Sequence, residues 1–274
     1  MTFREKLACK YDRLASEFLG IIDSNCLESP EYLMQLQDCR FLSREKQLEM
    51  KENLPLVLEQ RTPAECDVLS AYVELNDQEI VSCLADITND ILAVLPEGIE
   101  YYAVPAGHYH ISVVMLQDLR PVDMANTTLL QHRLSNQGVE EIAEILQKKL
   151  LALQCSPYCL SLYGIRIASD GAIIAVFTDD GRTFELRREL ESSVQSHVRP
   201  EYRKYKKTLI HTTLARILDQ VDLQTLLALF EKQRQYFCIP DGRMKQIVSE
   251  ICLGRETRWM HSEVRVLKRL PLQK

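Results

Sequence analysis

The chain has 274 residues, of which 46% are apolar and 26% charged, proportions typical of a globular protein that builds its own hydrophobic core. Its formal net charge is −6, whereas proteins that coat long nucleic acids usually present a basic surface, so binding to long duplex DNA is not expected. No apolar run reaches the roughly 18 residues that a membrane-spanning helix requires, which argues against a membrane protein.

Nine cysteines are present, an odd number at irregular spacing, and none forms a CxxC pair. Cys155 and Cys159 lie four residues apart, but no second pair or nearby histidine completes a zinc site. Reduced, mostly buried thiols are therefore expected, as in a reducing compartment. The N-terminal segment lacks the apolar core of a secretory signal, so we expect a cytoplasmic location.

The first section of the chain, up to about residue 60, has the pattern of helices. Apolar side chains recur there at helical spacing, at Leu7, Tyr11, Leu14, Phe18 and Ile21. The sequence Arg61-Thr62-Pro63 ends this section, as a proline should. We expect residues 1–62 to form an N-terminal helical extension, which could dock a protein partner, and residues 63–274 to form the main domain.

From Asp67 onward strands and helices mix. β-branched and apolar runs predict strands at 68–75, in two pieces within 98–117, and at 158–167, 171–178, 208–217, 245–253 and 262–270. Asn76-Asp77 can cap a helix that runs to about residue 95, and further segments predict helices at about 139–153, 183–198 and 223–235. We expect Arg255, Arg258 and Trp259 in a loop between the last two strands. This mixed order predicts an α+β fold of largely antiparallel sheet with helices outside, not alternating βα units.

Two of the six histidines lie in apolar strand segments and are each followed, two positions later, by a hydroxyl. The motifs are His110-Ile111-Ser112 and His211-Thr212-Thr213. Because strand side chains alternate between faces, the histidine and the hydroxyl of each motif share one face. An imidazole transfers protons near neutral pH, and a hydroxyl donates to a phosphate oxygen. Two such units around one phosphodiester would supply an acid and a base without a metal ion.

With their flanking residues, Tyr109–Val113 and Ile210–Leu214, both motifs fit the pattern apolar-His-x-Ser/Thr-apolar, and residues 161–190 carry a glycine-bearing hairpin followed by a helix. In these features, the chain from about residue 65 to 270 resembles the 2H phosphoesterase superfamily, which includes the LigT-like RNA ligases and cyclic phosphodiesterases. The resemblance implies a bilobed α+β fold of two antiparallel sheets, with outer helices and pseudo-two-fold symmetry.

The resemblance also implies roles for the motif residues. His110 and His211 would be the catalytic acid/base pair, and Ser112 and Thr213 would bind the phosphate oxygens. No cofactor and no metal are implied. The substrate would be a nucleotide with a cyclic phosphate or a short RNA, with a 2′,3′-cyclic, 2′-5′ or related phosphodiester bond.

Other side chains are candidates for contacting the substrate. The stretch from Arg199 to Lys207 precedes His211 and interleaves basic residues with tyrosines, which suits phosphate contact and base stacking but is equally typical of a solvated turn. The candidates are His108, Tyr102, Tyr163, Tyr205, Lys207 and Arg258. Tyr102 and Tyr163 could equally belong to the core, and His108 could be a strand-edge residue.

Three other interpretations stay open. The same residues could bind or sense a nucleotide or an RNA end without turnover. The protein could act mainly through residues 1–60 as an interaction protein. His108, His110 and His211 could also be imagined as metal ligands, although no carboxylate lies close in sequence to complete such a set.

Overall fold

The computed structural model describes residues 5–6, 65–119, 124, 130–131, 133–167, 171–198, 209–219, 221–239, 244–258 and 263–273. Of the predicted N-terminal extension only Glu5 and Lys6, both helical, are described, so the boundary at residue 62 lies outside the described residues. The same holds for the stretch from Arg199 to Lys207 and for Trp259. None of the described helices is long and apolar enough to cross a bilayer.

The first of two sheets has four strands in the spatial order β3-β1-β8-β9, and each neighbouring pair is antiparallel. The strands are β1 (Glu65–Glu74), β3 (His110–Leu119), β8 (Glu250–Arg258) and β9 (Glu263–Pro271). In the central strand β1 nearly every residue is buried, whereas the edge strand β9 keeps its charged side chains largely exposed.

The second sheet has five strands in the order β2-β6-β5-β4-β7, and again every described pair is antiparallel. The strands are β2 (Tyr101–Ala103), β6 (His211–Ile217), β5 (Ala172–Thr178), β4 (Tyr158–Ile167) and β7 (Lys245–Val248). The apolar run of β5 is buried at every position, which matches its place in the middle of the sheet.

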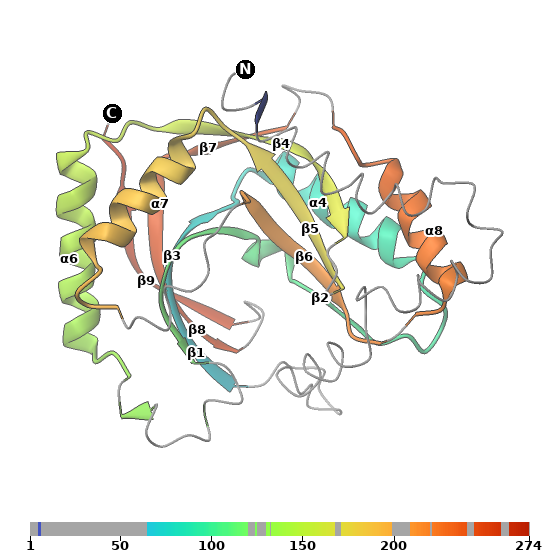
Figure 1. The fold of residues 1–274 in the computed structure, drawn as a ribbon, viewed down its shortest axis with the longest axis horizontal. Coiled ribbons are helices and arrows are strands. Elements are labelled where there is room, and N and C mark those ends of the chain that lie inside the picture. Colours follow the sequence, from blue (N-terminus) through green and yellow to red (C-terminus); the bar gives the residue numbers. More distant parts are fainter. Residues whose placement is uncertain are drawn as a thin grey trace.

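Two pairs of helices cover the sheets. The helices are α4 (Gln78–Leu92), α6 (Asn136–Ala152), α7 (Arg182–Ser193) and α8 (Leu223–Arg234). α6 and α7 contact each other and reach β9 and β3 of the first sheet, whereas α4 and α8 contact each other and reach β6 and β4 of the second. Figure 1 shows the two helix pairs on opposite sides of the molecule, with the strands between them. The predicted two-sheet α+β fold with outer helices is confirmed.

Local signals in the sequence explain where the helices begin. Asp77, predicted as a cap, accepts hydrogen bonds from the backbone N–H groups of Glu79 and Ile80 at the start of α4. Ser135 caps α6 and Asp222 caps α8 in the same manner. The buried residues of α6 recur at helical spacing, at Val139, Ile142, Ala143, Leu146 and Leu150.

Two predictions about strands are wrong. The segment 245–253 is not one strand but two, β7 and β8, which meet at Ser249 and belong to different sheets. Arg255 and Arg258 lie on β8 and not in a loop. Arg255 is tolerated there because its Nε lies 3.2 Å from a carboxylate oxygen of Asp67, which is 1% exposed. In the sequence alone a charged residue such as Arg255 indicates a loop, because its partner Asp67 is far away in the chain.

Candidate active site

The two histidine motifs occupy equivalent places on β3 and β6. His110 is the first residue of β3 and His211 is the first residue of β6. Over the first seven residues both strands have the same order of half-buried and buried side chains. The two histidines and their partner hydroxyls are half-buried, whereas the residues between them, Ile111 and Thr212, are 0% and 1% exposed. The predicted alternation of faces is therefore confirmed in both motifs.

Each strand is also irregular directly after the hydroxyl residue. On β3, Ser112 pairs with Tyr72 while Val114 pairs with the next residue of β1, so Val113 is skipped. On β6, Thr213 and Ala215 pair with successive residues of β5, so Leu214 is skipped. A bulge re-aims the residues beside it and increases the local twist. Both strands therefore carry a bulge directly after the hydroxyl residue, which supports two structurally similar lobes.

The motifs are joined by a direct hydrogen bond. The backbone N–H of His110 donates to Oγ1 of Thr212, at 3.1 Å. The segment before His110 runs alongside β6. Strand β2 pairs with β6, and the N–H of Val104, directly after β2, donates to the carbonyl of Leu214 on β6. Motifs 101 residues apart in sequence therefore meet, because Thr212, the middle residue of the second motif, holds the backbone of the first.

Thr212→Val is expected to lower the free energy of unfolding by about 1–3 kcal/mol, because it leaves the His110 amide without this acceptor. Valine keeps the size of threonine, so packing is preserved. Denaturant unfolding measures the change. Thr183→Val serves for comparison, since Thr183 is a buried threonine outside both motif sequences that bonds Tyr158. Unchanged stability would show that the contact contributes nothing.

The ring of His110 is oriented by two neighbours. Its Nδ1 lies 3.1 Å from the backbone carbonyl oxygen of His108. Because a carbonyl only accepts, Nδ1 carries the proton and the neutral ring keeps its lone pair on Nε2. The ring of Tyr72 meets the His110 ring edge-on, with centroids 5.5 Å apart. In this orientation Nε2 is the ring nitrogen of His110 that is left to accept or donate a proton.

His108 lies in a turn directly before β3, and its backbone contacts His110. It does not lie on the strand with His110 but ends a short 3-10 turn, Ala106–His108, and β3 begins two residues later. Its described contact with His110 is made by the backbone carbonyl, which any residue could supply. Substrate contact by the His108 ring stays a prediction.

Tyr72 is 2% exposed and fits its place because of a glycine. It lies on β1 between Ser112 of β3 and Cys252 of β8. A Cβ on Gly254 would lie 2.7 Å from a ring carbon of Tyr72, so only glycine leaves room for the ring. Burial raises the pKa of Tyr72, which therefore remains a neutral phenol beside His110.

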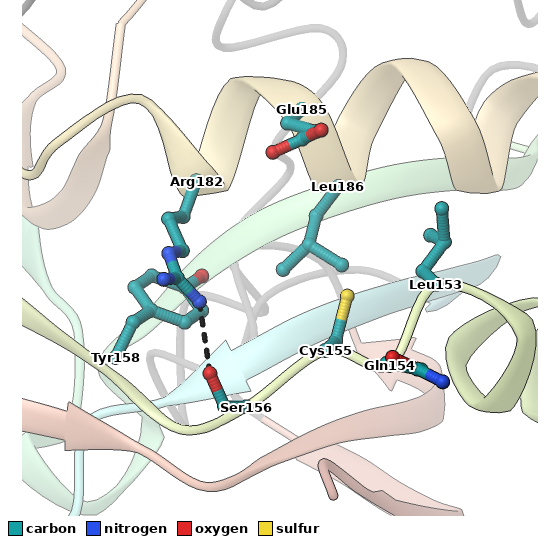
Figure 2. A pocket seen from close by; sticks show the side chains of 8 residues that line it. All are labelled: Leu153, Gln154, Cys155, Ser156, Tyr158, Arg182, Glu185 and Leu186. Carbon is teal, nitrogen blue, oxygen red and sulfur yellow. Dashed lines mark hydrogen bonds between the residues drawn. The ribbon is translucent and has the colours of Figure 1, made fainter.

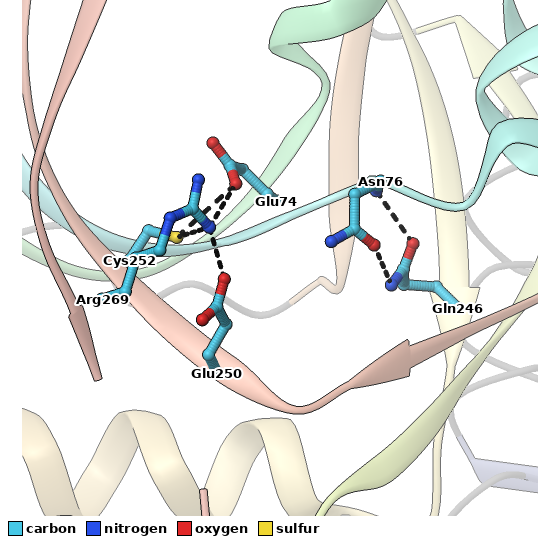
Figure 3. Close-up of polar contacts among 6 residues, drawn as sticks. All are labelled: Glu74, Asn76, Gln246, Glu250, Cys252 and Arg269. Atoms are coloured by element: carbon cyan, nitrogen blue, oxygen red, sulfur yellow. Dashed lines mark hydrogen bonds and ion pairs between the residues drawn. The ribbon is translucent and has the colours of Figure 1, made fainter. Parts of the chain in front are cut away.

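An acidic cluster lies next to His110 on the first sheet. Glu74 is directly opposite His110 across the β1–β3 pair. Its carboxylate lies 2.9 Å from the guanidinium of Arg269, which also binds Glu250 and contacts the sulfur of Cys252 (Figure 3). A single internal cation therefore pairs with both carboxylates and balances one of their two negative charges.

The same cluster has the spacing of a metal site. Within the described part of the chain, ligand atoms of Glu74, Glu250 and Cys252 lie within 4.8 Å of one another. Burial, with a smaller contribution from Glu74, raises the pKa of the Cys252 thiol to about 12, so the thiolate that a metal would need is disfavoured. With Arg269 in place, these residues fit an internal ion-pair network better than a metal ion.

The remaining predicted residues are spread over the fold. Tyr102 and Tyr163 are both partly buried and pack against the hydrophobic core. Arg258 lies opposite Glu65 at one end of β1, whereas His110 lies opposite Glu74 at the other end, roughly 30 Å away at the usual rise of a strand. A substrate bound at His110 would have to extend along most of β1 to contact Arg258, so substrate contact by Arg258 stays a prediction. Tyr205 and Lys207 lie outside the described residues.

Arg216 belongs to the site face but was missed from the sequence. Strict alternation from His211 would place a side chain five positions later on the opposite face. The bulge at Leu214 reverses this, because Thr213 and Arg216 pair with residues two apart on β5, Ile174 and Ala172. No sequence signal marks that bulge, so the sequence alone does not place Arg216 on this face.

A small pocket lies away from the motifs. Its volume is about 90 Å³, and it opens between the end of α6, the start of β4 and the first turns of α7 (Figure 2). It is lined by Leu153, Gln154, Cys155, Ser156, Tyr158, Arg182, Glu185 and Leu186. Arg182 donates a hydrogen bond to the Ser156 hydroxyl across it, at 3.0 Å. None of the predicted site residues lines this pocket.

Comparison with known proteins gives likeness in fold. No protein-family model and no curated protein matches the sequence. TT0787 of Thermus thermophilus is 16% identical with a TM-score of 0.48, over 75% of this chain and 98% of that one. E. coli LigT complexed with 3′-AMP is 16% identical with a TM-score of 0.46, over 77% and 100% of the two chains. Kluyveromyces marxianus Usb1 is 12% identical with a TM-score of 0.42, over 76% and 99%. Each of these alignments spans about three quarters of this chain at low identity, and the chemistry of its site has to follow from its own residues.

Proposed function

We propose that this protein is a metal-independent phosphodiesterase that acts on a cyclic-phosphate nucleotide or a short oligonucleotide, with a 2′,3′-cyclic or 2′-5′ bond. One observation carries the proposal: two His-x-Ser/Thr motifs with the same exposure pattern and the same bulge are joined by the hydrogen bond from His110 to Thr212. A purely structural histidine on a strand needs neither a second copy nor a matching hydroxyl.

For a 2′,3′-cyclic phosphate, the proposed step is hydrolysis. One imidazole accepts a proton from water as the water oxygen attacks phosphorus and a new P–O bond forms. The other imidazole, protonated, donates its proton to the 2′ or 3′ ribose oxygen as that P–O bond breaks. One water is consumed, and the product is a nucleoside monophosphate. The orientation of the substrate decides which histidine is the acid.

The hydroxyls have a separate task in this scheme. Ser112 and Thr213 share the faces of His110 and His211 and are half-buried, so each can donate to a non-bridging phosphate oxygen. Such donors stabilise the charge that gathers on these oxygens in the transition state. The chain's own groups then cover proton transfer and charge stabilisation.

The experiment is a turnover assay with 2′,3′-cyclic AMP and a 2′-5′ linked diadenosine in the presence of EDTA. We expect product from at least one substrate at a rate that EDTA leaves unchanged. Loss of all activity in EDTA, restored by a divalent cation, would refute the metal-independent step. Binding of both substrates without product would indicate a sensing module instead of an enzyme.

A further inference from the structure

A buried arginine on α7 contacts the backbone of both motif regions. Arg187 is 6% exposed, although it carries a permanent charge. Its Nη2 donates to the carbonyl oxygen of Ser112 at 2.9 Å, and its Nε lies 3.3 Å from the same oxygen. Its Nη1 donates to the carbonyl of Leu209, two residues before His211, at 2.7 Å. One guanidinium therefore bridges β3 of the first sheet and the residues that lead into β6 of the second.

The geometry suits arginine and no other side chain. The guanidinium is planar and holds its donors in a fixed fork, so two acceptors bound to it have a fixed separation. Lysine offers a single charged nitrogen whose rotatable donors do not fix the separation of two acceptors. The ring of Phe184, one turn earlier on α7, lies 5.1 Å from the guanidinium carbon and adds a cation–π contact.

Arg187 binds the backbone next to groups whose position matters for the proposed chemistry. Ser112 carries a phosphate-binding hydroxyl, and Leu209 leads through one residue into His211. Charge-assisted hydrogen bonds are about twice as strong as neutral ones, and here they are buried. Together with the His110–Thr212 bond, they tie the two motifs at a second point.

We propose that Arg187 is a positioning residue that sets the separation of the two histidine motifs and so controls the rate of the chemical step. The proposal rests on the proposed phosphodiesterase function and adds to it a residue that does not touch the substrate. A misplacement of about 1 Å in a catalytic group costs on the order of 100-fold in rate. Loss of the Arg187 bridge should therefore appear mainly in kcat.

The test compares Arg187→Lys and Arg187→Gln with wild type, using 2′,3′-cyclic AMP in EDTA and normalising rates to the folded fraction from circular dichroism. Lysine keeps the charge but loses the bridge, and glutamine loses both. We expect kcat to fall roughly 10- to 100-fold in both variants, with KM changed less than about threefold. If Arg187→Gln does not fold, Arg187→Lys decides alone.

Two controls on α7 separate positioning from stability. Thr183→Val removes the buried hydrogen bond to Tyr158 one turn earlier, and Arg188→Gln removes an exposed positive charge. Both should leave kcat per folded molecule unchanged.

The proposal is overturned if kcat per folded molecule stays at the wild-type value in Arg187→Lys or in Arg187→Gln. Retained activity in the lysine variant would mean that charge suffices, and retained activity in the glutamine variant would mean that the residue only stabilises the fold. A wild-type protein that turns over neither substrate would defeat the proposed function itself, which is a different result from an active wild type with active Arg187 variants.

Discussion

His110→Ala and His211→Ala are each expected to lower kcat for 2′,3′-cyclic AMP by about 100-fold or more, the scale of a lost general acid or base. Both rings are half-buried at the start of equivalent strands, so their removal leaves the core intact. The double variant should be little slower than either single variant, because the two groups act in one step. Steady-state kinetics with protein matched for folded fraction measures this.

The exposed His197, which contacts Ser196 beyond the end of α7, provides the matched control. His197→Ala should have wild-type kcat. The pH dependence of kcat/KM should be bell-shaped, because one imidazole must be neutral and the other protonated, and each alanine variant should lose one limb of the bell. Wild-type kcat in either His110→Ala or His211→Ala would contradict the acid/base assignment.

Gly254→Ala is expected to lower the free energy of unfolding by about 1–3 kcal/mol, the usual cost of overpacking a core. The added methyl would lie 2.7 Å from Cε1 and 2.9 Å from the hydroxyl of Tyr72. Tyr72 is 2% exposed, so its ring has little room to yield, and any shift also affects the His110 ring that it contacts. We therefore expect kcat to fall as well as stability.

Gly138→Ala is the control for that substitution. Its Cβ would meet the Ser135 hydroxyl at 3.5 Å, an ordinary contact, and the position lies inside α6. Alanine is the better helix former, so stability should stay the same or rise by up to about 1 kcal/mol. Thermal unfolding of the two variants side by side separates them. If Gly254→Ala were as stable as Gly138→Ala, the close packing of Tyr72 on β8 would be disproved.

Much of the fold could be predicted because its elements carry local signals. β1, β5 and β6 are apolar runs with β-branched residues, and α4 begins at the cap expected from Asp77. The two histidine motifs also follow from sequence, since alternation of faces is a local property of a strand. These signals fix which residues are half-buried in each motif, and the structure agrees.

The features that join the motifs could not be predicted, because they depend on contacts between distant segments. Arg187 lies in a helical sequence rich in charges, and nothing there distinguishes it from its exposed neighbour Arg188. No characteristic residue type marks the bulge that brings Arg216 to the site face. Thr212 was expected only to face away from the site, yet its hydroxyl holds the backbone of His110.

The central claim is that one phosphate group contacts both motifs at once. Histidine side-chain NMR on protein labelled with ¹³C-histidine, titrated with inorganic phosphate at constant pH, tests it directly. We predict that the signals of His110 and His211, assigned from the two alanine variants, shift along one binding curve with a common Kd, while His197 stays unchanged. Shifts of only one of the two rings, or two curves with different Kd values, would contradict a single shared site.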